Sequence, residues 1–189
     1  MTTTVYFIRH AQSDFSIRDE RSRPLTARGM ADAESLVGLL GDRTIDRIYS
    51  SPYVRTIQTV TPLARARGLA VVAREGFRER STNIRYESRD DFFKFAERQW
   101  SDFDHKADGG ESLREVQVRN VAELRNALEE ASGLDIVIAT HGTALCTILN
   151  FFDPGCGFDY FMKMVEKTPY LVTVKFDGQV FLEHTRYPE

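Results

Sequence analysis

The sequence offers two arginines and two histidines whose chemistry suits an anion: Arg9, His10, Arg55 and His141. An arginine presents a planar fork of N–H donors that can hold two phosphate oxygens at once. A neutral histidine has one unprotonated ring nitrogen, which can attack an electrophilic centre such as phosphorus. Together these residue types predict a site for a phosphate dianion in which an imidazole is the nucleophile.

The two histidines are expected to differ in charge. His10 must be neutral to attack phosphorus, so we expect its second ring nitrogen to donate to a backbone carbonyl. We expect His141 to stay charged and to pair with the phosphate oxygens as negative charge moves in the transition state. The leaving oxygen also needs a proton, which a carboxylic acid with a pKa raised by partial burial can supply.

Such a site requires that distant parts of the chain meet. Val5 to Ile8 and Ile136 to Ala139 are unbroken apolar runs, as is typical of strands covered on both faces, and a histidine follows shortly after each run. If these strands are parallel neighbours, His10 and His141 emerge at the same edge of the sheet. Arg55, in the first turn after another predicted strand, can reach that edge too.

Weaker patterns extend the alternation of strands and helices. Further strands are predicted at 47–49, 69–73, 171–176 and 179–183, and the last two read as a hairpin. Strands that alternate with helices indicate an α/β protein. We expect a three-layer α/β/α fold, with a mostly parallel central sheet and helices on both faces.

The predicted helices begin and end at recognisable residues. One covers about 30–40, and a second covers about 53–67, with Ser51 as its cap. Pro62 falls inside this second helix and predicts a kink or an early break. A capping box at 112–115 predicts the start of a third helix.

A chain of 189 residues with 42% hydrophobic composition fits one core, so we expect a single domain over 1–189. The segment at about 78–110 breaks the alternation, because it gathers many charges and aromatic side chains. We expect it to form a short helical cap insertion, folded over the ends of the strands, where open sheets bind their ligands. Its aromatic side chains are expected chiefly to pack.

The composition limits the classes of partner. A formal net charge of −3 gives no bulk attraction to nucleic acid or to anionic membranes. No apolar stretch is long enough to cross a bilayer, and we expect a cytoplasmic protein. Cys146 and Cys156 are too few for a disulfide framework or a zinc knuckle. Neither a metal ion nor an organic cofactor is expected, and the oligomeric state is left open.

These residues resemble the motifs of the histidine phosphatase superfamily, also called the phosphoglycerate mutase-like family. The family's Arg-His-Gly at the end of the first strand is similar to Arg9-His10-Ala11, and its Ser-Ser-Pro-x-x-Arg-x-x-Gln-Thr motif resembles residues 50–59. Further similar motifs follow in the family's order over most of the chain: Pro24-Leu25-Thr26 with Gly29, Gly110-Glu111-Ser112 and Thr140-His141-Gly142.

The resemblance implies roles for these residues. His10 would carry the phosphoryl group in a phosphohistidine, and Arg9, Arg55 and His141 would hold the phosphate. The full set of residues implied to bind the phosphate or the substrate is Arg9, Gln12, Ser13, Ser16, Arg55, His141 and Gly142.

The proton donor follows from the same resemblance. Glu79 lies in a stretch similar to the family's hydrophobic-x-Glu, with Glu87 and Glu75 as alternatives.

Two positions depart from the family's pattern. Ala11 replaces a glycine and restricts the backbone beside the nucleophile. Ser16 stands where many members carry an asparagine, and both changes are expected to affect substrate preference.

The function that the resemblance implies is a phosphatase that hydrolyses phosphomonoesters through a phosphohistidine, without a metal or organic cofactor. Its partner would be a small phosphorylated substrate or a phosphoprotein, and inorganic phosphate would be its product. Two alternatives stay open: a phosphoryl transfer of the phosphoglycerate mutase type, and a non-catalytic module that binds phosphoproteins. The compact chain favours hydrolysis, because family mutases that act on phosphoglycerate tend to be longer.

Overall fold

The predicted central sheet is present in the computed structural model, which describes residues 1–187. Its strands, in the spatial order β3-β2-β4-β1-β5-β6, are β1 (Thr2–Arg9), β2 (Arg47–Ser50), β3 (Val71–Ala73), β4 (Asp135–Thr140), β5 (Tyr170–Asp177) and β6 (Val180–Tyr187). The strands from β3 to β1 are parallel, whereas β5 is antiparallel to β1 and β6 is antiparallel to β5. The mostly parallel sheet is therefore confirmed.

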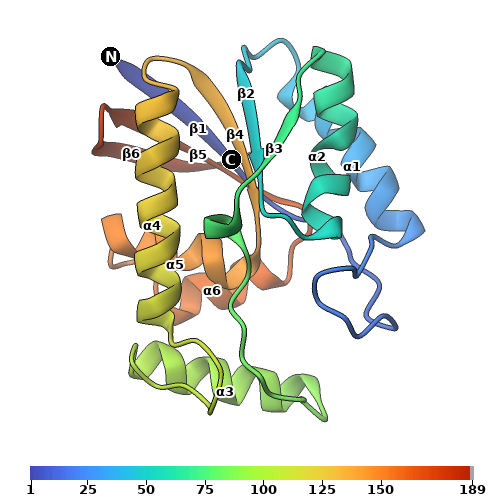
Figure 1. The fold of residues 1–189 in the computed structure, drawn as a ribbon, viewed down its shortest axis with the longest axis vertical. Coiled ribbons are helices and arrows are strands. Elements are labelled where there is room, and N and C mark those ends of the chain that lie inside the picture. Colours follow the sequence, from blue (N-terminus) through green and yellow to red (C-terminus); the bar gives the residue numbers. More distant parts are fainter. Residues whose placement is uncertain (188–189) are drawn as a thin grey trace.

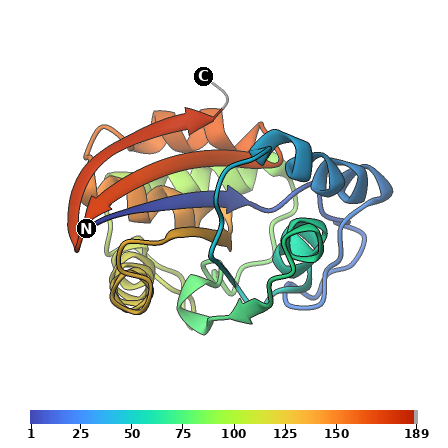
Figure 2. The same ribbon diagram turned by 90° about the horizontal axis from the view of Figure 1, so that it is seen from above.

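Helices cover both faces of this sheet, as Figures 1 and 2 show. One face packs against α1 (Ala27–Leu40) and α2 (Val54–Arg67), and the other against α4 (Leu113–Glu130), α5 (Gly142–Phe152) and α6 (Phe158–Val165). This arrangement confirms the three-layer α/β/α fold. None of the helices within residues 1–187 combines the length and the apolar composition that a membrane crossing requires.

Side chains along β1 alternate between the two helical layers. Val5 and Phe7 belong to the core beneath α4, α5 and α6, while Tyr6 and Ile8 belong to the core beneath α1 and α2. All four are buried. Burial of a side chain such as Phe7 stabilises the fold by roughly 1.5–3 kcal/mol relative to exposure. β1 is therefore fixed between the two helical layers, and this also fixes where the residues directly after Arg9 begin.

Helix α2 differs from the prediction at two points. It continues without interruption through Pro62, so the early break is wrong, while the kink offered as its alternative stays a prediction. The proline removes one hydrogen bond of the helix, but Pro62 and Leu63 are buried and their packing keeps the helix intact. Ser51 is not the cap, because the N-cap position is Tyr53 and no side chain caps the helix there. The predicted end is confirmed, since Gly68 follows with a φ of 65°.

Two other predicted elements are confirmed. The capping box of Ser112 and Glu115 begins α4, with both of its reciprocal hydrogen bonds present. β5 and β6 form the predicted hairpin, which turns at Gly178 with a φ of 58°. A glycine suits this turn because a positive φ is strained for other residues.

The segment at 78–110 contains one helix, α3 (Arg89–Ser101), which follows a short 3-10 helix, η1 (Glu75–Phe77), and a stretch without regular structure. Figure 1 shows α3 at the lower end of the molecule, beyond α5 and α6. Phe92 and Trp100 of α3 lie against Phe161 of α6, with ring centroids 6.5 and 5.9 Å apart. These aromatic side chains therefore pack against α6. A cap insertion within a single domain stays a prediction.

Candidate active site

The ends of β1 and β4 bring the two histidines together. The strands are parallel neighbours, and His10 N–H donates to the Thr140 carbonyl oxygen at 3.0 Å. The His10 and His141 rings meet edge to face, with centroids 5.3 Å apart and an angle of 67° between the ring planes. The expectation that both histidines emerge at one edge of the sheet is confirmed.

The ring of His10 is held by a backbone carbonyl at Nδ1. It is buried, and Nδ1 lies 2.7 Å from the carbonyl oxygen of Ala11. A carbonyl only accepts, so Nδ1 carries the proton and Nε2 of the neutral ring has a free lone pair. Burial, with the charges of Arg55 and Arg9, lowers the pKa of His10 well below its ordinary value. The expected neutral ring with a carbonyl partner is therefore present.

His141 is buried more deeply than His10. Its ring is buried, and its Nε2 lies 2.7 Å from Ser51 Oγ. Burial and the charge of Arg55 lower the pKa of His141 well below its ordinary value. The ring is therefore neutral in the protein alone, and a charged His141 beside a bound phosphate stays a prediction. A dianion beside the ring would favour the protonated form.

Arg55 reaches the site from the first turn of α2. Its Nη1 donates to the carbonyl oxygen of Glu20, and its Nη2 lies 3.0 Å from Oε2 of the same residue. The guanidinium carbon lies 5.0 Å from the centroid of the Tyr53 ring. Burial lowers the pKa of Arg55. Protein groups therefore hold two of its nitrogens, while its positive charge acts on His10.

Arg9 approaches from the last position of β1. Its Nη1 donates to the carbonyl oxygens of Met164 and Lys167, at 3.0 and 2.8 Å. Burial lowers the pKa of Arg9 to about 10, and the charge of Glu79 opposes this shift. The guanidinium is therefore still protonated at neutral pH. Arg9 brings a positive charge to the site and also ties β1 to the chain around the end of α6.

Four polar atoms of the predicted site residues are buried and have no hydrogen-bond partner within residues 1–187: Arg9 Nε, Ser13 Oγ, Arg55 Nε and His141 Nδ1. The arginine nitrogens and the serine hydroxyl are donors, and His141 Nδ1 is a donor when Ser51 donates to Nε2. A buried donor without a partner is unfavourable. This set of donors suits an anion with several acceptor oxygens, such as phosphate.

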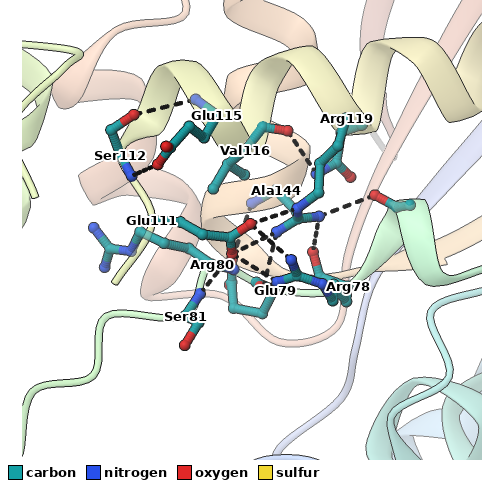
Figure 3. Close-up of polar contacts among 12 residues, drawn as sticks. Arg78, Glu79, Arg80, Ser81, Glu111, Ser112, Glu115, Val116, Arg119 and Ala144 are labelled. Carbon is teal, nitrogen blue, oxygen red and sulfur yellow. Dashed lines mark hydrogen bonds and ion pairs between the residues drawn. The ribbon is translucent and has the colours of Figure 1, made fainter. Parts of the chain in front are cut away.

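Glu79 lies beside the start of α5, the helix that begins directly after His141. Its two carboxylate oxygens accept from the backbone N–H groups of Thr143 and Ala144, at 3.1 Å each, and one also accepts from Arg80 N–H at 2.8 Å (Figure 3). These bonds satisfy N–H groups that the first turn of a helix leaves without a partner. The carboxylate is therefore fixed next to His141.

The two alternative proton donors lie at the surface. Glu75 is exposed and forms an ion pair with Arg21. Glu87 is exposed in the stretch that precedes α3. Of the three carboxylates, Glu79 is the one bonded to the backbone beside the site.

Of the other residues predicted to bind phosphate, only some lie at the site. Gln12 is exposed, and its Oε1 accepts from the Thr26 hydroxyl at 2.9 Å. Ser16 is exposed in the loop that follows β1. Gly142 begins α5, where an added Cβ would lie 3.4 Å from Arg9 Nε, so Gly142 lies directly beside that guanidinium. The structure places Gly142 with the cluster and leaves Gln12 and Ser16 at its outside.

Ala11 fits its position without backbone strain. It is fully buried in a small cluster with Leu25 and Ala33, and its N–H donates to Thr59 Oγ1 at 3.0 Å. Within residues 1–187, Asn83 is the one residue other than glycine with a positive φ, so Ala11 has an ordinary backbone conformation. The methyl group is therefore accommodated beside His10.

Three residues at the site were not predicted as part of it. Ser51 contacts His141, the Tyr53 ring meets the His141 ring edge to face at 4.9 Å between centroids, and Glu20 pairs with Arg55. Ser51 and Tyr53 share a motif with Arg55, so their position in the chain was an available signal. Glu20 lies in a charged loop, where no sequence pattern distinguishes it from its neighbours.

One group of possible metal ligands occurs in the part of the chain that the structure describes: Asp153, Cys156 and His184. His184 Nε2 lies 3.0 Å from Asp153 Oδ2 and 3.6 Å from Cys156 Sγ. Burial and the nearby Asp153 charge raise the pKa of Cys156 to about 12, so the thiol is protonated at neutral pH. The three side chains form a hydrogen-bonded cluster, and His184 lies on the edge strand β6.

The sequence model of the histidine phosphatase superfamily (branch 1) matches residues 5–182 of this chain. The probable phosphoglycerate mutase GpmB of Shigella dysenteriae serotype 1 is 27% identical over 151 residues, which cover 75% of this chain and 70% of that protein. GpmB of Yersinia pestis (strain Pestoides F) is 29% identical over 156 residues, which cover 77% of this chain and 73% of that protein.

Solved structures share the fold. Bacillus stearothermophilus YhfR has a TM-score of 0.74 and 22% sequence identity, with coverage of 95% of this chain and 94% of the other. A phosphoserine phosphatase mutant from Entamoeba histolytica, in complex with phosphoserine, has a TM-score of 0.81 and 18% identity, with coverage of 98% and 97%. The arrangement of the sheet and its two helical layers is therefore common to all three chains.

Proposed function

This chain belongs to the histidine phosphatase superfamily, and from that premise we propose that it hydrolyses phosphomonoesters through a phosphohistidine intermediate. One observation carries the proposal. The His10 ring is neutral and its Nδ1 is bonded to the Ala11 carbonyl, which leaves Nε2 as a nucleophile. The charges of Arg9 and Arg55 act on the same ring. An uncharged nucleophile among fixed positive charges suits a phosphate dianion.

The first step forms the phosphohistidine. The lone pair of His10 Nε2 attacks phosphorus, and the bond between phosphorus and the ester oxygen breaks. The electron pair of that bond goes to the leaving oxygen, which takes the proton of Glu79, so Glu79 enters this step as the neutral carboxylic acid and leaves it as the carboxylate. Arg9, Arg55 and His141 stabilise the negative charge on the phosphoryl oxygens. The Ser13 hydroxyl, which is buried without a partner in residues 1–187, is a further donor to them.

The second step releases inorganic phosphate. A water molecule attacks phosphorus, the bond between nitrogen and phosphorus breaks, and its electron pair returns to His10 Nε2. Glu79, now a carboxylate, takes the proton that the water loses. His10 is neutral again at the end, and the cycle calls for neither a metal ion nor an organic cofactor. The substrate is a small phosphorylated molecule or a phosphoprotein.

Hydrolysis of p-nitrophenyl phosphate tests this function. We expect turnover that is unchanged by EDTA and that falls at least about a thousandfold in His10→Ala, because the nucleophile is removed. His105→Ala is the matched control, since His105 lies in the loop between α3 and α4, outside the site, and it should keep wild-type activity. A strict requirement for added metal ions, or full activity in His10→Ala, would contradict the proposal.

A mutase is the second candidate, and the GpmB relatives favour it at 27% and 29% identity. A mutase keeps the phosphoryl group on the enzyme and returns it to a related substrate, whereas a phosphatase gives it to water. The two are separated by incubation with 3-phosphoglycerate, with and without 2,3-bisphosphoglycerate. Net release of phosphate supports the phosphatase, and isomerisation that is faster than phosphate release supports the mutase.

A further inference from the structure

We infer that Arg119 and Glu111 are positioning residues for the proton donor: they fix the segment 76–81 so that the Glu79 carboxylate meets the start of α5. The inference rests on the proposed function, because it concerns the proton that Glu79 gives to the leaving oxygen. Both residues act on the reaction through Glu79.

Arg119 uses all five of its N–H donors in this network. Nη1 donates to the carbonyl oxygens of Gly76 and Arg78, at 3.0 and 2.8 Å, and Nη2 donates to the carbonyl oxygen of Glu79 at 3.1 Å. Nε and Nη2 also donate to the two carboxylate oxygens of Glu111, at 2.9 and 3.1 Å (Figure 3). One guanidinium therefore binds three carbonyls of the segment that carries the proton donor.

Glu111 completes the network from the loop before α4. Its carboxylate accepts two bonds from Arg78, at 2.6 and 2.8 Å, and one from the N–H of Ser81 at 2.9 Å. Burial alone would raise the pKa of Glu111, but the hydrogen bonds from Arg119 and Arg78 outweigh it and lower the pKa to about 2. The ionised carboxylate therefore holds the segment on both sides of Glu79.

The segment needs this network because it has no regular structure of its own. Between η1 and α3, residues 78–88 belong to no helix or strand. Arg119 extends from α4 to the backbone of the segment, while the Glu79 carboxylate is bonded to the first turn of α5. α4 and α5 are themselves joined, since Gln117 Nε2 donates to the Thr147 carbonyl at 3.0 Å. The two helices therefore hold Glu79 at its backbone and at its carboxylate.

A lysine cannot replace Arg119 in this arrangement. It has one nitrogen with three donors and no planar fork, so it cannot bind three carbonyls and a carboxylate at once. Arg119→Lys keeps the positive charge but releases part of the segment. A catalytic acid works only when it is held close to its productive geometry. We therefore expect Arg119→Lys to impair proton donation and to leave phosphate binding intact.

Two substrates with different leaving groups test this inference. Phenyl phosphate has a basic leaving oxygen that needs a proton, whereas 2,4-dinitrophenyl phosphate has one that departs without it. We expect Arg119→Lys to lower kcat/KM for phenyl phosphate by about 10- to 100-fold, and for the dinitrophenyl ester by less than about 3-fold. The inhibition constant of inorganic phosphate should stay within about 2-fold, because its ligands are unchanged.

Matched variants show whether the effect passes through Glu79. Arg74→Lys is the control, since Arg74 also joins this part of the chain to α4 through its ion pair with Glu130. It should leave kcat/KM for both substrates and the inhibition constant of phosphate unchanged. Glu79→Gln should show the same dependence on the leaving group. Adding Arg119→Lys to Glu79→Gln should lower kcat/KM by less than about 3-fold more, because the positioned acid is already absent.

The inference is overturned if Arg119→Lys lowers kcat/KM equally for both substrates, leaves both unchanged, or keeps its full effect in the Glu79→Gln background. Arg119→Lys does not fold if its thermal unfolding curve shows no cooperative transition. In that case the same changes in kcat/KM are expected for Glu111→Gln. Failure of the proposed function gives a different set of results: the wild-type protein hydrolyses neither substrate, or His10→Ala retains the activity.

Discussion

Glu20 and Arg55 form an ion pair in which Oε2 and Nη2 are 3.0 Å apart. A carboxylate of the protein therefore already binds one nitrogen of the guanidinium that we propose for the substrate phosphate. The other carboxylate oxygen lies 2.7 Å from Nη2 of Arg23, which is buried. One exposed side chain therefore joins two buried arginines. A phosphate that binds Arg55 through the same nitrogen has to displace this carboxylate or share the arginine with it.

Replacement of Glu20 is expected to strengthen phosphate binding. Glu20→Gln removes the competing negative charge, and we expect the inhibition constant of inorganic phosphate to fall by about 1.5- to 5-fold, as for an exposed ion pair. Glu34→Gln is the control, because Glu34 has the same exposed fraction of 57% and pairs with Arg65 at 3.0 Å on the surface. An unchanged or higher inhibition constant in Glu20→Gln would show that Glu20 does not compete with phosphate.

The activity should persist into mildly acidic solution. The proposed nucleophile is neutral His10, and burial lowers its pKa well below the ordinary 6.5. Since protonation inactivates the ring, kcat/KM should fall only as the pH drops through this lowered value. The measurement is the pH profile of kcat/KM for an aryl phosphate. An acid limb with its midpoint at or above 6.5 would contradict a neutral, buried nucleophile.

The stability should also depend on pH in this range, with a definite sign. His10 and His141 both have pKa values well below 6.5 in the folded protein, while the unfolded chain takes up protons near 6.5. The unfolded state therefore binds more protons, and the free energy of unfolding rises with pH. This contribution is fully present above 6.5 and is lost as the pH falls toward the lowered values. Denaturant titrations between pH 5 and 7.5 measure the slope, and His141→Gln should reduce it.

The loop after β1 depends on a close approach to α1. A Cβ added at Gly29 would lie 2.1 Å from the carbonyl oxygen of Gln12, whereas one added at Gly38 of the same helix would meet nothing within 4 Å. We expect Gly29→Ala to lower the free energy of unfolding by about 2 kcal/mol or more. Gly38→Ala should leave it unchanged or raise it by up to about 1 kcal/mol. Equal stability of the two variants in urea titrations would refute the close approach.

Patterns within single elements explain which parts of this fold follow from the sequence. The apolar runs of β1 and β4 predict buried parallel strands, and their pairing brings His10 and His141 to within 5.3 Å between ring centroids. The capping box at α4 is equally local, because both partners lie within four residues. Each of these predictions needs only the spacing of residue types along the chain.

Contacts between distant segments explain what the sequence could not predict. The neutral state of His141 depends on complete burial and on the charge of Arg55. The pairing of Glu20 with Arg55 depends on how a charged loop folds back onto α2. The early break expected at Pro62 was wrong because packing of the surrounding helix outweighs one lost hydrogen bond. None of these contacts leaves a periodic signal.

Trapping the covalent intermediate tests whether His10 receives the phosphoryl group. The protein is incubated briefly with a radiolabelled phosphomonoester, quenched under alkaline conditions and digested, and the labelled peptide is identified by mass spectrometry. We expect an acid-labile, alkali-stable phosphoryl group on His10, which His10→Ala lacks. Turnover without any labelled protein, a label on another residue, or phosphate binding with neither label nor turnover would contradict it.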